Sequence, residues 1–146
     1  MKLESFIDQG FKLFCKMYPS DKYAQGIDID FTEELSDRSV PGVYILTISD
    51  EEVLKIGQSS HLGNRFNRMY KCVSNTTNDK VRAHVRDYDV IWVYAFPMPK
   101  LKHMFNVKGK AVKLETSFAP SLEKYLLSEY KKLNNNELPL LNSAIC

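Results

Sequence analysis

Apolar side chains recur at helical spacing near the N-terminus, at Leu3, Phe6, Ile7, Phe11, Leu13, Phe14 and Met17. This spacing predicts an amphipathic helix over residues 3–18, which the run Pro19-Ser20-Asp21 ends. Residues 20–41 are polar and mixed in character, so we predict an irregular lead-in rather than a separate domain. The chain is therefore divided into an N-terminal helix and lead-in over residues 1–40 and a main domain over residues 41–146.

Three stretches in the middle of the chain carry the β-branched and aromatic residues that favour strands. Val43 to Ile48 reads as a buried strand, and a polar turn at residues 49–52 connects it to a return strand from Val53 to Gly57. Asp89 to Phe96 is the strongest strand signal, with Trp92 expected in the core. Residues 97–116 are basic, and a second hairpin is expected around Gly109.

Two further helices are predicted. Ser59 or Ser60 caps a helix with the apolar stripe Leu62, Phe66, Met69 and Tyr70, and Pro120 lies in the first turn of a final helix. The order helix, hairpin, helix, strand, helix predicts an α+β fold. We expect a small three-stranded, mostly antiparallel sheet flanked by helices, with an N-terminal helical extension.

Composition and charge add little to this prediction of the fold. The chain has 146 residues with 44% hydrophobic content, enough for one core, and a formal net charge of +2 neither demands nor excludes a nucleic-acid partner. Basic residues gather between Lys55 and Arg86 and again between Lys100 and Lys113. The three cysteines fit no metal-finger spacing, and no signal peptide or membrane-length apolar run is visible. We expect a soluble, cytoplasmic protein with no membrane partner.

Five short elements carry candidate chemistry, and they fall on the predicted strands and helices in a fixed order. They are Gly42-Val43-Tyr44, Lys55-Ile56-Gly57, Leu62-Gly63-Asn64-Arg65-Phe66, Glu123 with the following Leu126-Leu127, and Asn142. This arrangement resembles the GIY-YIG nuclease superfamily over roughly residues 41–142. The superfamily includes homing endonucleases, an excision-repair incision subunit and several restriction enzymes.

The resemblance implies a role for each element. Glu123 would hold a single Mg²⁺ (or Mn²⁺), because hard cations prefer carboxylate oxygen. Arg65 would bind a phosphate oxygen, and Tyr44 would orient or deprotonate the attacking water. Gly57 and Asn142 would support the site.

Lys55 departs from the commonest pattern, which has tyrosine at this position. A restriction-enzyme branch of the superfamily carries lysine here, so the difference does not imply inactivity. The ammonium would either favour the phenolate of Tyr44 or contact phosphate, and the sequence leaves both roles open.

Some of these assignments have rivals. Arg68 lies one turn after Arg65, and Glu129 lies six positions after Glu123, but their surroundings match the family less well. His61 is a surface residue or a DNA contact. A set of DNA-binding candidates follows from the basic residues near the motifs: Arg68, His61, Arg82 and Arg86.

These features predict a metal-dependent DNA endonuclease that hydrolyses phosphodiester bonds. A sequence-specific restriction-type enzyme and a phage or mobile-element nuclease are both consistent with the residues. A homodimer is expected, because one small domain with one site cuts one strand. The alternatives are a catalytically inactive GIY-YIG-like DNA-binding or interaction module, and an unrelated α+β protein that matches by chance.

Overall fold

The computed structural model describes residues 2–22, 26–35, 37–48, 52–71 and 79–142. The helices are α1 (Leu3–Asp8), α2 (Leu62–Asn64), the π-helix η1 (Arg65–Tyr70), α3 (Asp79–Tyr88) and α4 (Ala119–Leu133). The strands are β1 (Lys12–Pro19), β2 (Ile27–Phe31), β3 (Gly42–Thr47), β4 (Val53–Ser59), β5 (Ile91–Pro97), β6 (Leu101–Val107) and β7 (Lys110–Thr116).

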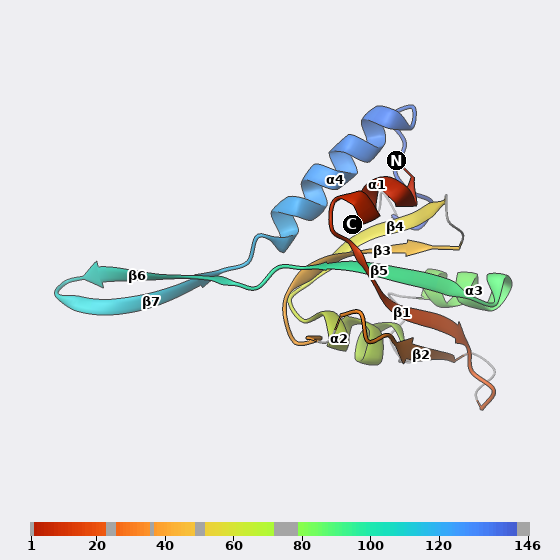
Figure 1. The fold of residues 1–146 in the computed structure, drawn as a ribbon, viewed down its shortest axis with the longest axis horizontal. Helices are drawn as coiled ribbons and strands as arrows, with labels where there is room; N and C mark the ends of the chain where they lie inside the picture. The colour runs from red at the N-terminus through yellow and green to blue at the C-terminus, as the bar shows by residue number, and fades with distance from the viewer. Residues whose placement is uncertain (1, 23–25, 36, 49–51, 72–78, 143–146) are drawn as a thin grey trace.

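The main sheet is antiparallel throughout and has the strand order β2-β1-β5-β3-β4. Helices cover both of its faces (Figure 1). Val43 and Ile45 of β3 pack with α1 and α4, and Tyr44 and Leu46 pack on the opposite face with α2, η1 and α3. Both faces of β3 are therefore buried, which is why its sequence is almost continuously apolar.

The α+β class is as predicted, but the expected sheet of three strands is wrong. Residues 12–18, predicted as helix, lie in β1, and β2 lies within the predicted irregular lead-in. Gly10, at a φ of +106°, ends α1 instead. Phe11 N–H donates to the Phe6 carbonyl, and the two rings pack 5.3 Å apart, as in a Schellman ending. The boundary proposed at residue 41 stays a prediction, although strands from both sides of it share one sheet.

The other predicted elements are present. β3 and β4 form the expected hairpin, β5 follows the third strand signal, and α4 has Pro120 in its first turn. The turn expected at residues 49–52 falls mostly outside the described residues. Trp92 is not a core residue, because it lies on the solvent side of β5 with 37% of its surface exposed.

The hairpin predicted around Gly109 also exists, as β6 and β7. It forms a separate two-stranded sheet that projects from the body between β5 and α4 (Figure 1). Gly109 has a φ of +80° in the turn, a conformation that L side chains rarely adopt. Among the described helices, none is long and apolar enough to cross a membrane.

Candidate active site

Tyr44 occupies the centre of the site, on β3 directly opposite Gly57 of β4. Its ring is fully buried and lies across the Gly57 backbone. A Cβ atom built on Gly57 would lie 2.5 Å from the phenol oxygen and 2.8 Å from Cε2 of Tyr44. No real Cβ tolerates such a contact, so glycine is needed here for the close approach of a side chain, at a position predicted to support the site.

The Tyr44 hydroxyl takes part in a compact polar cluster. It lies 2.6 Å from the Tyr70 hydroxyl, and Arg65 Nε donates to it at 3.1 Å. Arg65 Nη2 also lies 3.5 Å from the Tyr70 hydroxyl, and its guanidinium stacks over the Tyr70 ring at 4.8 Å. The structure therefore joins the two predicted residues, Tyr44 and Arg65, through direct contact.

Tyr70 is a site residue that the sequence reading missed, since it was assigned only to an apolar stripe. Arg65 and Tyr70 are the first and last residues of η1. The wider turn of a π-helix brings positions five apart onto one side, and π-helical turns are frequent at functional sites. An α-helical reading gives no reason to pair these two residues, so the sequence offers no clear signal for the contact.

Burial of Tyr44 raises its pKa well above the usual value for a phenol, and the neighbouring Tyr70 raises it further. The charge of Arg65 acts in the opposite direction but does not compensate. Tyr44 therefore keeps its proton near neutral pH. In this state its hydroxyl can both donate and accept hydrogen bonds.

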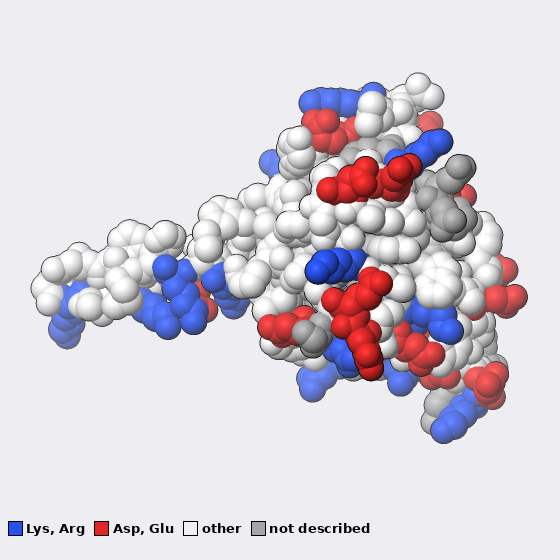
Figure 2. Space-filling model, in the orientation of Figure 1, with Lys and Arg blue, Asp and Glu red and all other residues white. Residues whose placement is uncertain are grey.

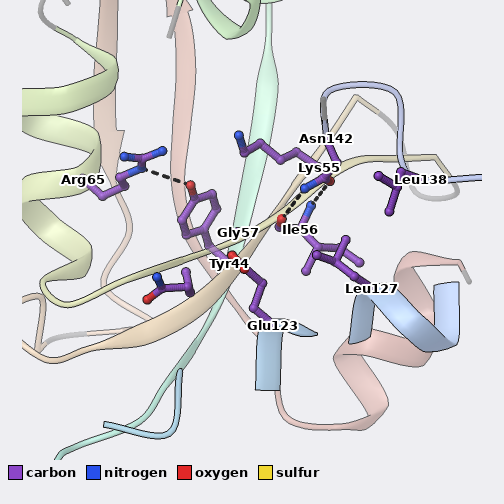
Figure 3. A pocket seen from close by; sticks show the side chains of 10 residues that line it. Tyr44, Lys55, Ile56, Gly57, Arg65, Glu123, Leu127, Leu138 and Asn142 are labelled. Carbon is purple, nitrogen blue, oxygen red and sulfur yellow. Dashed lines mark hydrogen bonds between the residues drawn. The ribbon is translucent and has the colours of Figure 1, made fainter. Parts of the chain in front are cut away.

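The cluster opens into a cavity of about 490 Å³ between β4, η1 and α4 (Figure 3). The predicted residues on its wall are Tyr44, Lys55, Gly57, Arg65, Glu123 and Asn142. They come from five separate segments of the chain. The fold thus brings together all of the residues to which the resemblance assigned chemistry or support.

Glu123 extends from the first turns of α4 to this cavity and is partly buried. Loss of water around its carboxyl group raises its pKa, while the charges of Lys55 and Arg65 and a hydrogen bond from the Gln58 backbone N–H lower it. The carboxylate thus faces two cations across the cavity. Lys55 lowers the pKa of Glu123, whereas the neighbours that shift the pKa of Tyr44 are Tyr70 and Arg65.

Asn142 holds the chain after α4 against β4. Its Oδ1 accepts from Ile56 N–H at 2.8 Å, and its Nδ2 donates to the Ile56 carbonyl at 2.7 Å (Figure 3). Leu141 N–H donates to the Leu54 carbonyl nearby at 2.7 Å. The side-chain amide therefore satisfies the backbone of β4 beside Lys55, and both of its ends are engaged in this contact.

This architecture is found in solved structures, although no protein-family model matches the sequence and no curated protein matches it. The chain is similar to restriction endonuclease HPY188I in complex with product DNA, with a TM-score of 0.59 and 21% identity over 99% of this chain and 87% of that one. It is also similar to a mutant of bacteriophage T4 EndoII, with a TM-score of 0.61 and 17% identity over 98% and 99% of the two chains. The chain has a nuclease fold. At these identities the likeness extends to the fold alone.

The described residues could hold a divalent cation only at a site with few protein ligands. Among the described residues, no group of three or more histidine, cysteine, aspartate or glutamate side chains gathers to enclose a metal ion. Of the described residues that line the open cavity, Glu123 alone presents a carboxylate. Mg²⁺ commonly binds through one or two carboxylates, keeping several waters and taking substrate phosphate oxygens, so a single glutamate is compatible with it.

The expected DNA-contacting residues divide into two groups. Arg68 is exposed on η1, and Arg86 is partly exposed on α3. His61 is partly exposed as well, but its Nδ1 accepts from Asn64 N–H at 3.0 Å and so caps α2. Arg68 and Arg86 thus lie at the surface, whereas the described contact of His61 is structural.

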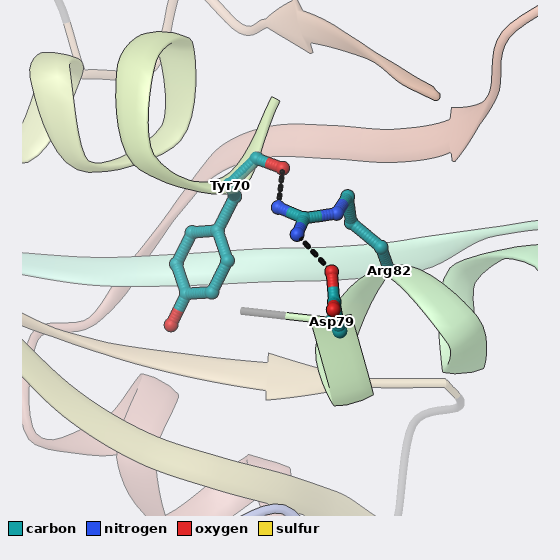
Figure 4. A network of polar contacts seen from close by, with 3 residues as sticks. All are labelled: Tyr70, Asp79 and Arg82. Atoms are coloured by element: carbon teal, nitrogen blue, oxygen red, sulfur yellow. Dashed lines mark hydrogen bonds and ion pairs between the residues drawn. The ribbon is translucent and has the colours of Figure 1, made fainter. Parts of the chain in front are cut away.

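Arg82 is a correction to the sequence reading. It is 1% exposed, and its guanidinium donates to the Tyr70 carbonyl at 3.1 Å and pairs with Asp79 (Figure 4). A buried guanidinium with these partners cannot meet phosphate at the surface. Arg82 instead ties α3 to the end of η1 through the backbone carbonyl of Tyr70, the residue whose hydroxyl contacts Tyr44.

Proposed function

We propose that this protein is a metal-dependent DNA endonuclease that hydrolyses phosphodiester bonds. The observation that carries the proposal is the cavity in which Tyr44, Lys55, Arg65 and Glu123 converge. The shared fold with HPY188I, a restriction endonuclease described with product DNA, and with EndoII supports it. The ordered resemblance to the GIY-YIG superfamily names the same four residues.

The positively charged side chains of the site would stabilise the negative charge that develops on a phosphate in the transition state. Hydrolysis adds a water oxygen to phosphorus, breaks one phosphorus–oxygen ester bond and delivers a proton to the leaving oxygen. Arg65 is positioned to bind a non-bridging phosphate oxygen with a permanently charged group. Lys55, on the wall of the same cavity, would contact a second oxygen of the phosphate.

Tyr44 contributes through its hydrogen bonds. Its oxygen can accept from Arg65 and from Tyr70 together, which leaves its own O–H to donate into the cavity. A fixed O–H donor at this point would orient the attacked phosphate or the water. Because the pKa of Tyr44 is raised, we do not assign it the role of base in the free enzyme.

The cofactor proposed is Mg²⁺ or Mn²⁺, held by Glu123. When bound, such an ion lowers the pKa of its water ligand and neutralises charge on the phosphate. Because the pKa of Glu123 is raised, its carboxylate is protonated, and lost as a metal ligand, at a higher pH than that of an ordinary glutamate. Glu123 is the one acidic side chain among the described residues that line the cavity.

Plasmid cleavage tests the function directly. Supercoiled and linear duplex DNA are incubated with the full chain, with Mg²⁺, with Mn²⁺ or with EDTA. Cutting that depends on the metal is expected for the natural chain and is expected to be lost in Glu123→Gln and Arg65→Ala. Absence of cutting by the natural chain on both substrates, with duplex binding retained, would favour the inactive binding module.

A matched control is available on the same helix. Glu129 lies six residues after Glu123 and pairs with Lys132 at 3.2 Å, away from the cavity. Glu129→Gln should cut at the rate of the natural chain, and equal loss in both variants would refute the assignment of Glu123. Discrete products would indicate a restriction-type specificity. We also propose a homodimer for double-strand cutting, which light scattering of the DNA-free protein tests.

A further inference from the structure

The positive charge of the chain is concentrated on the β6–β7 hairpin. Residues 100–116 hold five lysines and one glutamate, out of twenty basic and eighteen acidic residues in the chain. The remainder therefore carries fifteen basic and seventeen acidic residues, a formal charge of −2. A projecting segment of charge +4 is attached to an acidic body, and lysines gather along one side of it in Figure 2.

The hairpin has two chemically different faces. Strand register puts Lys102 with Glu115 and Met104 with Lys113 on one face, where Lys102 and Glu115 form an ion pair at 3.9 Å. The other face carries five apolar residues together with His103, Lys110 and Thr116. The apolar ones are Leu101, Phe105, Val107, Val112 and Leu114. Leu101, Phe105, Val107 and Leu114 are each about half exposed, at 49–50%.

The described part of the body leaves this hairpin exposed. It forms its own two-stranded sheet, and a two-stranded hairpin is at best marginally stable without a packing partner. Its second strand leads directly into α4, where Glu123 reaches the cavity seven residues after Thr116. The hairpin is therefore attached at the end of α4 that carries Glu123 (Figure 1).

We propose that the β6–β7 hairpin is an arm that grips duplex DNA beside the cavity, an inference that rests on the proposed endonuclease function. A two-stranded ribbon fits the major groove of B-DNA. In that placement the apolar face lies toward the base edges and thymine methyl groups, and the lysines reach phosphates on the groove rims. Seven residues per strand span about 24 Å, less than the ~34 Å of one duplex turn.

The salt dependence of DNA binding measures the phosphate contacts separately from contacts to the bases. Lys108, Lys110 and Lys113 are exposed, so changing all three to glutamine removes up to three phosphate contacts without disturbing a core. The slope of log binding constant against log salt should become shallower by about 2.7, at ~0.9 per contact. The same relation gives a loss of affinity of up to about 500-fold near 0.1 M salt.

A control with the same change of net charge tests whether position matters. Lys2, Lys12 and Lys22 are exposed on the body, and their triple glutamine variant should keep the natural slope. Binding is followed by fluorescence anisotropy of a labelled duplex in EDTA, which prevents cutting. Phe105→Ala should weaken binding without changing the slope, because it removes an apolar contact.

The outcomes distinguish this proposal from the function on which it rests. An unchanged slope in the arm variant, or an equal decrease in the arm and body variants, would overturn the arm. If Phe105→Ala instead halves the molecular mass in solution and leaves DNA binding intact, the apolar face belongs to a second copy of the chain, which also overturns it. Failure of the natural chain to bind or cut any duplex would refute the endonuclease function itself.

Discussion

Replacement of Gly57 by alanine tests the central packing relation of the site. Alanine usually stabilises a strand relative to glycine by roughly 0.5–1 kcal/mol, because glycine loses more backbone freedom on folding. At this position the added methyl group would lie 2.5 Å from the phenol oxygen of Tyr44. The structure therefore predicts the opposite sign from the ordinary substitution.

The expected cost follows from the burial of the ring. Tyr44 is fully buried and packs edge-on against Phe66, with ring centroids 5.0 Å apart, so it has little room to move away. Overpacking of this kind costs about 1–3 kcal/mol in the free energy of unfolding. For a chain of this size, the melting temperature should fall by roughly 3–10 °C.

The same displacement should reduce DNA cleavage. The Tyr44 hydroxyl lies 2.6 Å from that of Tyr70 and 3.1 Å from Arg65 Nε, and a shift of one ångström breaks this geometry. Misplacement on this scale costs on the order of 100-fold in rate. Thermal unfolding and single-turnover plasmid cleavage measure the two effects on the same preparation.

A double-mutant cycle separates the proposed clash from any other effect of the methyl group. Tyr44→Leu removes the ring atoms that the Cβ at position 57 would meet. In that background Gly57→Ala should no longer destabilise the protein, giving a coupling energy of about 1–3 kcal/mol. If Gly57→Ala costs the same with and without the ring, or costs nothing with it, the reasoning from close approach fails.

Three other predictions follow from described contacts. Asn142→Ala should lower the free energy of unfolding by about 1–3 kcal/mol in urea denaturation, because it leaves two backbone groups of β4 without partners; an unchanged midpoint would contradict this. Arg82→Met should cost about 1–3 kcal/mol and also lower the cleavage rate, whereas a stability loss with a normal rate would show that α3 does not position Tyr70. Folding raises the pKa of Glu123, so the ionised carboxylate lowers the free energy of unfolding once the pH exceeds the usual carboxyl pKa. Glu123→Gln should therefore have a higher melting temperature than the natural chain at pH 8. This difference should vanish near pH 3, where the glutamate is protonated. A constant difference across pH would refute that sign.

The strands and helices that carry the motifs are readable from sequence for a physical reason. β3 is buried on both faces, so its run of apolar residues is unambiguous, and Pro120 marks the start of α4. The motif residues lie at fixed positions on these elements. The structure has Glu123 and Asn142 on the wall of the same cavity as Tyr44.

The N-terminal strands were missed because their apolar spacing fits a helix as well as a strand. Phe11, Phe14 and Met17 suit a helical stripe, but the positive φ of Gly10 separates them from α1. A glycine followed by an apolar residue was the available signal for the end of the helix. Whether the chain after this glycine forms a strand depends on the pairing of β1 with β5, which no local sequence pattern reveals.

The contacts behind the site were missed for different reasons. Tyr70 reaches Tyr44 through a π-helical turn, a distortion that α-helical periodicity does not predict. Arg82 lies within a basic run of the kind that normally faces solvent, yet it is buried against the end of η1. In both cases the role of the residue follows from tertiary packing and differs from the role that its residue type suggested.

The position of β5 in the strand order has a consequence for how the chain folds during synthesis. β1 with β2 and β3 with β4 are neighbours in sequence, but only β5 joins the two pairs, and Lys16 of β1 meets Trp92 of β5 seventy-six positions later. Until translation has passed residue 97, each pair has an open edge that can recruit another chain. Insertion of β5 between β1 and β3 closes those edges in a single event, so a nascent chain released before this strand should aggregate rather than fold.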